Sequence, residues 1–119
     1  MIVLLLTTTL AYAADVYEFC RIEKQKWNER YQRFDTELVS TFYTFQKPQM
    51  IVYEKSFELD RNEHPIIEKS VKHGMPCWRE HKNSELCYDQ AGGQMFWEWN
   101  TRAGETFRDV MDVCRVNGE

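Results

Sequence analysis

The chain has 119 residues, with 15 basic and 19 acidic side chains and a formal net charge of −4. The net charge is negative, and the chain contains no dense cluster of Lys and Arg. Both observations argue against a nucleic-acid or anionic-membrane partner. Aromatic residues make up 14% of the chain. Side chains of that size allow a small domain to fill a core.

The first 13 residues contain no charged side chain and end in Ala11-Tyr12-Ala13. An apolar run that closes on a small-x-small triplet is typical of a secretory signal peptide. The run is much shorter than the roughly 20 residues that a membrane-spanning helix needs. We therefore expect a signal peptide at residues 1–13, a single small secreted domain at residues 14–119, an extracellular location and no membrane span.

All the cysteines follow the predicted signal peptide: Cys20, Cys77, Cys87 and Cys114. An even number of cysteines in a secreted domain predicts disulfides, and four cysteines allow three pairings. The favoured pairing is Cys20–Cys114 with Cys77–Cys87. It ties the start of the first predicted helix to the end of the last one and closes one short local loop.

Apolar and aromatic side chains recur between residues 15 and 46 at steps of three, four or seven, namely Cys20, Trp27, Tyr31, Phe34, Leu38, Phe42 and Phe45. This spacing is typical of one face of an α-helix. Asp15 and Glu18 resemble a capping box at its start, and Pro48 marks its end. The pattern predicts one long amphipathic helix, with the rest of the chain packed on its aromatic stripe.

A second interpretation of the same region is a β-hairpin. Residues 39–45 and 50–53 are rich in β-branched and aromatic side chains, and residues 46–49 lie between them as a turn. A hairpin at about residues 38–57 is the alternative to the helix.

Further helices are expected along the rest of the chain. Short ones are predicted at residues 50–59 and 76–82, and another at residues 65–73, which Gly74 and Pro76 would end. A last helix is predicted at residues 92–115, from helical steps that begin at Met95 and Trp99. Gly104 interrupts this run, and residues 100–104 are alternatively a turn between two strands. The expected fold is an all-α, disulfide-stapled bundle of three to five helices, and the alternative is α+β.

No motif for nucleophilic, phosphate-binding or dinucleotide chemistry occurs in the chain. His73, Cys77 and His81 follow one another at four-residue steps, with Cys87 beyond, which on a continuous helix is a plausible zinc arrangement. A secreted cysteine is more often in a disulfide. The sequence therefore predicts a non-enzymatic protein with no metal and no cofactor.

Two stretches resemble known families. Residues 77–81 and 87–91, Cys-Trp-Arg-Glu-His and Cys-Tyr-Asp-Gln-Ala, resemble the catalytic helix of secreted phospholipase A2. That family places a calcium-binding aspartate after the histidine, whereas Lys82 follows His81 here, so this resemblance implies an inactive relative centred on His81. The spacing Cys77-x9-Cys87, with an aromatic helix and the terminal Cys114, resembles a nematode cysteine-rich secreted helical domain of unknown function. It implies an all-helical extracellular domain and supplies no catalytic residues.

The segment Met95-Phe96-Trp97-Glu98-Trp99 holds too many large side chains for one helix face. Met95 and Trp99 fit the buried stripe, which leaves Phe96 and Trp97 as a possible interaction surface.

The sequence leaves three functions to consider. The first is a secreted ligand or effector that binds another extracellular protein. The second is an extracellular carrier of a small apolar ligand, which requires a cavity of a few hundred Å³. The third is the inactive phospholipase A2-like protein.

Overall fold

The computed structural model describes residues 14–43, 45–59, 61–81 and 83–118. Within these residues the chain forms strands and no helix. Ten strands follow one another: β1 (Asp15–Asn28), β2 (Arg33–Thr41), β3 (Gln49–Val52), β4 (Ser56–Leu59), β5 (Asn62–Pro65), β6 (Glu68–Lys72), β7 (Met75–His81), β8 (Ser84–Asp89), β9 (Gln94–Asn100) and β10 (Thr106–Val116).

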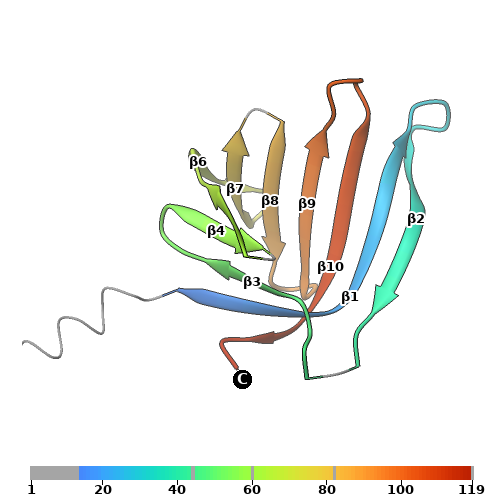
Figure 1. The fold of residues 1–119 in the computed structure, drawn as a ribbon. Coiled ribbons are helices and arrows are strands. Elements are labelled where there is room, and N and C mark those ends of the chain that lie inside the picture. Colours follow the sequence, from blue (N-terminus) through green and yellow to red (C-terminus); the bar gives the residue numbers. More distant parts are fainter. Residues whose placement is uncertain (1–13, 44, 60, 82, 119) are drawn as a thin grey trace, which may run out of the picture.

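All the strands belong to one antiparallel sheet in the order β5-β4-β3-β1-β10-β9-β8-β7-β6, and β2 also pairs with β1. The sheet curls into a half-barrel (Figure 1). Its two edge strands, β5 and β6, are consecutive in the sequence. Ile66 and Ile67 connect them, and their backbone amides bond to the carbonyls of Lys55 and Arg79. The curl therefore brings the two edges close enough for a two-residue link.

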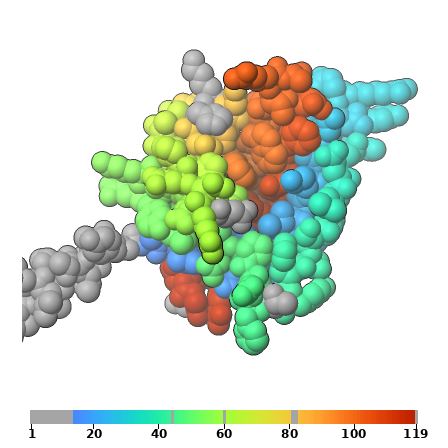
Figure 2. All heavy atoms as spheres, viewed as in Figure 1, coloured from blue at the N-terminus to red at the C-terminus, as the bar shows by residue number. Residues whose placement is uncertain are grey.

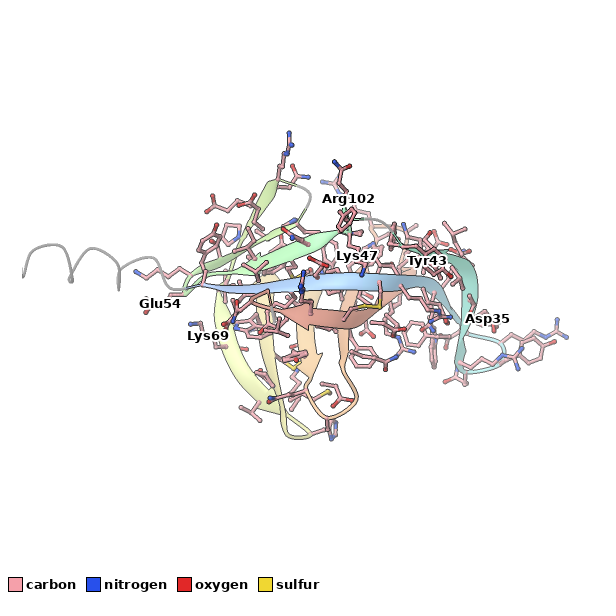
Figure 3. All side chains as sticks on the ribbon, turned by 90° about the horizontal axis from the view of Figure 1, so that it is seen from below. Asp35, Tyr43, Lys47, Glu54, Lys69 and Arg102 are labelled. Atoms are coloured by element: carbon pink, nitrogen blue, oxygen red, sulfur yellow. A yellow bond between two sulfur atoms is a disulfide. The ribbon has the colours of Figure 1, made fainter. Side chains whose placement is uncertain are left out.

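β1 is the longest strand, and it has a different partner on each side. Along one side it pairs with β10. Along the other side it pairs with β3 through its first residues and with β2 through the rest. Seen from below, β1 crosses the molecule from the end near Glu54 to the end near Asp35 (Figure 3).

The predicted all-α bundle is wrong, and so is each helix in it. The expected helix over residues 15–46 is the hairpin of β1 and β2, whose turn at residues 29–32 contains neither Gly nor Pro. The expected helices at residues 50–59, 65–73, 76–82 and 92–115 are β3 with β4, β6, β7, and β9 with β10. The helical spacing of the apolar residues was misleading. Most of these residues come from both faces of β1 and β2 and from the turn between the two strands.

The α+β alternative is also wrong. Residues 38–41 and 49–52 are indeed strands, but they do not pair with each other. β2 and β3 lie one after the other along the same side of β1, with Thr41 opposite Arg21 and Gln49 opposite Glu18. The turn expected as an alternative after Asn100 does occur, between β9 and β10. Gly104 adopts a left-handed φ of 84° there, which a side chain would disfavour.

The core lies on the inner face of the curled sheet. It contains Tyr17, Phe19, Met50, Val52, Phe57, Leu86, Met95 and Met111, none of them more than 7% exposed. Ring contacts across the sheet confirm that this face closes on itself. Tyr17 of β1 meets Tyr88 of β8, and Phe57 of β4 meets Trp97 of β9, although neither pair of strands is adjacent.

Two disulfides join the cysteines that the sequence analysis paired, Cys20–Cys114 and Cys77–Cys87. Cys20 and Cys114 are skipped by the register of β1 and β10, where bulges flank Phe19. Cys77 and Cys87 lie directly opposite each other on β7 and β8.

The predicted signal peptide at residues 1–13 lies outside the described residues. Among the residues that are described, no helix is long and apolar enough to cross a membrane.

The two disulfides should contribute unequally to stability. Cys20–Cys114 spans 94 residues and Cys77–Cys87 spans 10. The loop-entropy expression gives the longer loop an advantage of about 2 kcal/mol. We expect the double variant Cys20→Ala/Cys114→Ala to lose that much more unfolding free energy than Cys77→Ala/Cys87→Ala, as measured by urea unfolding. Equal losses would contradict this expectation.

Glu23 ties the outer part of the β1–β2 hairpin together. Its carboxylate accepts hydrogen bonds from Thr36 of β2, from Gln25 and from Arg21. These bonds, that of Thr36 most of all, lower the pKa of Glu23 to about 2 from an ordinary value of 4.5.

The pKa of Glu23 predicts acid sensitivity. A lowered folded-state pKa stabilises the protein above pH 4.5, and this contribution is lost as the pH falls through about 2. We expect Glu23→Gln to be less stable than wild type at pH 6 and the gap to close progressively below pH 4.5. Unfolding midpoints in urea across this range measure the gap. A constant gap would show that Glu23 acts through packing alone.

Candidate ligand-binding site on the inner face

An open cavity of about 440 Å³ lies on the inner face of the sheet, between β9 with β10 on one side and β2 with β4 on the other. Its lining is mostly apolar and consists of Ile22, Lys24, Leu38, Ser40, Phe42, Pro48, Leu59, Trp97, Trp99, Asp109 and Met111. In the space-filling view, the orange and red atoms of β9 and β10 lie between the green atoms of β3 and β4 and the blue and turquoise atoms of β1 and β2 (Figure 2). The curl of the sheet creates the cavity.

The floor of the cavity continues into a row of aromatic rings, which we call the aromatic row: Phe57, His64, Trp97, Trp99 and Phe107. Trp97 and Trp99 have centroids 5.3 Å apart, and Trp99 stacks on Phe107 at 5.6 Å. Two strands provide the row from Trp97 outward. Trp97 and Trp99 share a face of β9 because residues two apart on a strand point the same way, and Phe107 of β10 lies opposite Trp99 in the register. The two tryptophans are only partly buried, so their rings are accessible from the cavity.

Asp109 is the acidic residue of the cavity lining. In the sheet register it lies between Trp97 of β9 and Lys24 of β1. Its Oδ1 atom is buried, and it accepts no hydrogen bond from any residue that the structure describes. Burial raises the pKa of this carboxyl group above its ordinary value, and the charge of Lys24 opposes the shift. An unpartnered buried carboxylate oxygen is costly to the fold.

Lys24 is the other charged residue of the lining, and it is exposed. Its ammonium group stays in water, so it pays little for lacking a close partner. No ion pair within 4 Å joins it to Asp109 among the described residues. The cavity thus combines an apolar, aromatic wall with one buried acceptor and one solvated cation at its margin.

Deeper in the sheet, a polar cluster links strands that are not neighbours. His64 Nδ1 lies 2.9 Å from Glu80 Oε1, and Ser84 Oγ donates to Glu80 Oε2 at 3.1 Å. Trp97 Nε1 donates to Ser84 Oγ at 2.9 Å. The carboxylate lies between the hydroxyl and the imidazole, whereas a catalytic triad needs the imidazole between the other two groups. These contacts hold β5, β7, β8 and β9 together, and they orient Trp97.

The strand geometry separates Phe96 from Trp97, the two residues predicted as an interaction surface. Consecutive residues of a strand point to opposite faces. Trp97 lines the inner cavity, while Phe96 lies on the outer face near the guanidinium of Arg108, 5.8 Å from the ring centroid. A contact made by either side chain remains a prediction, but one flat surface does not contain both.

The possible zinc ligands and the resemblance to a phospholipase helix do not fit this fold. Cys77 is bonded to Cys87, so neither sulfur is a free thiolate. His73 lies in the β6–β7 turn, and His81 is the last residue of β7. Residues 77–81 and 87–89 are strands, so the helix that the resemblance implies is absent from this part of the chain.

Asp109 was the residue that the sequence analysis missed. It falls within the helix predicted at residues 92–115, and an isolated acidic residue gives no sign of burial. Alternation of Phe107, Asp109 and Met111 on a strand was the available signal, since these residues share one face.

No protein-family model, no curated protein and no solved structure matches this chain.

The raised pKa of Asp109 predicts that its charge destabilises the fold. The cost is present above the folded-state pKa, and it vanishes as the pH falls below the ordinary value of 3.8. We expect Asp109→Asn to be more stable than wild type at pH 7 and the difference to shrink toward pH 3.8. Urea unfolding at several pH values measures it. A variant less stable than wild type at pH 7 would mean that the carboxylate is well paired.

Proposed function

We propose that this protein is an extracellular binding protein for a small apolar ligand, which it holds in the cavity on the inner face of the sheet. The observation that carries the proposal is the cavity of about 440 Å³, with two tryptophans and several aliphatic side chains in its wall. Small-molecule sites commonly occupy ~300–1,000 Å³ and are lined mainly by apolar and aromatic groups with a few polar ones.

An extracellular location is supported by two features. The apolar segment ending in Ala11-Tyr12-Ala13 reads as a signal peptide, and both pairs of cysteines are joined as disulfides. Disulfides persist mainly in oxidising compartments. A ligand carried outside the cell needs shielding from water, and a curled sheet offers this without a large domain.

Rigidity of the wall favours binding. The aromatic row is held by ring contacts along its length, and Trp97 is fixed by its bond to Ser84. A wall that is already ordered loses little conformational entropy when a ligand enters. The inner face therefore offers a largely preformed site, in which the ligand displaces water from the two indole rings.

The proposal predicts saturable binding of the neutral apolar probe N-phenyl-1-naphthylamine, with a rise in probe fluorescence and a change in tryptophan emission. Leu38→Lys should weaken binding by about tenfold, which corresponds to about 1.4 kcal/mol. Leu38 lines the cavity, yet its side chain is 58% exposed, so a charge there disturbs the ligand more than the fold. Titration at constant protein concentration measures both affinities.

Val71→Lys is the matched control. Val71 is an aliphatic residue on β6, it is 73% exposed, and it is outside the cavity lining. We expect it to bind the probe with wild-type affinity. Equal weakening in both variants, or no saturable binding by wild type, would overturn the proposed function.

A further inference from the structure

We infer that Asp109 recognises a positively charged group, so that the ligand of this cavity is a small organic cation with an apolar or aromatic body. The inference rests on the proposed function and adds the chemical class of the ligand. It depends on three observations: the state of the Asp109 carboxylate, the aromatic faces beside it, and the position of Lys24.

The carboxylate is available for a ligand. Asp109 Oδ1 is buried and accepts no hydrogen bond within the described part of the chain, although most buried carboxylate oxygens have a partner. Asp109 also lines the cavity, so an entering ammonium group meets this side chain, and a rotation of the carboxylate brings the covered Oδ1 atom to it. Such a bond between charged groups is shorter and stronger than a neutral one.

The indole rings beside Asp109 also favour a positively charged ligand. Trp97 lies directly opposite Asp109 on β9, and Trp99 follows two residues later on the same face. The face of an indole ring carries negative potential, so it attracts a cation and repels an anion. A ligand with an ammonium group near Asp109 can stack its apolar body on these rings.

Lys24 does not reverse this selection. It is the cation of the cavity lining, but it is exposed and well hydrated, so a bound anion gains little by meeting it. A bound cation, in contrast, relieves the buried charge of Asp109. Removing Lys24 should strengthen cation binding, because a like charge near the site disappears.

The test uses three naphthalene probes that differ only in charge: 1-naphthylmethylamine, 1-naphthalenemethanol and 1-naphthoate. Isothermal titration calorimetry at pH 7.5 measures each affinity for the whole secreted protein. We expect the amine to bind about tenfold more tightly than the alcohol, and the anion to bind most weakly. If the alcohol binds as well as the amine, or the anion binds best, the inference fails while the proposed function stands. If none of the three binds, the proposed function fails.

Variants separate charge recognition from a general effect on the fold. Asp109→Asn should bring the affinity of the amine to within about twofold of that of the alcohol. Asp112→Asn is the matched control, because Asp112 lies on the same strand outside the cavity and accepts a bond from Gln94. It should leave all three affinities unchanged. Lys24→Gln should raise only the affinity of the amine, and a loss of amine binding in that variant would overturn the inference.

Discussion

The structure depends on one constraint: β1 pairs with strands on both of its sides while it bends. β10 follows it along one side, and β3 and then β2 follow it along the other. The register shifts flank Phe19, where the strand turns its core residues inward. Bulges increase local twist and curvature, and the Cys20–Cys114 bond lies at the same place. The curl that begins there brings β4 across to β9, and this crossing both completes the core and borders the open cavity.

The two short edge strands of the sheet, β5 and β6, meet on the other side of the curl. β5 and β6 carry few buried side chains, so apolar packing alone contributes little at these edges. Polar contacts supply the link instead, through His64 and Glu80 and through Ser84 and Trp97. Because Ser84 is only 5% exposed, loss of any partner would leave a buried polar group unsatisfied. The same cluster that joins β5 to β7 and β8 therefore fixes Trp97, whose ring forms part of the wall of the cavity.

The sequence predicted the disulfide pairing and one turn correctly, but it predicted the wrong secondary structure. The outer half of β1 has polar residues on both faces, including Glu23, Lys24 and Gln25, because it extends beyond the core; strand alternation is therefore invisible there. The turn after Asn28 lacks Gly and Pro, and it is stabilised instead by the Asn28 side chain, which accepts a bond from the Tyr31 amide. Of the site, Trp97 was singled out together with Phe96, although the two lie on opposite faces of β9. Asp109 was not found, because the pairing of distant strands decides burial.

Asp109 shows how the fold and the proposed ligand are related. The position is flanked by Trp97 and Lys24 in the register, and an apolar residue there would extend the core from Met111 along β10 without any desolvated charge. We expect the carboxylate to lower the stability of the protein, which is the pattern found where a binding site is kept at the expense of packing. Two disulfides and a closed polar cluster elsewhere in the sheet offset that cost. A ligand cation would offset part of that cost locally, so binding and stability would be linked through the Asp109 carboxylate.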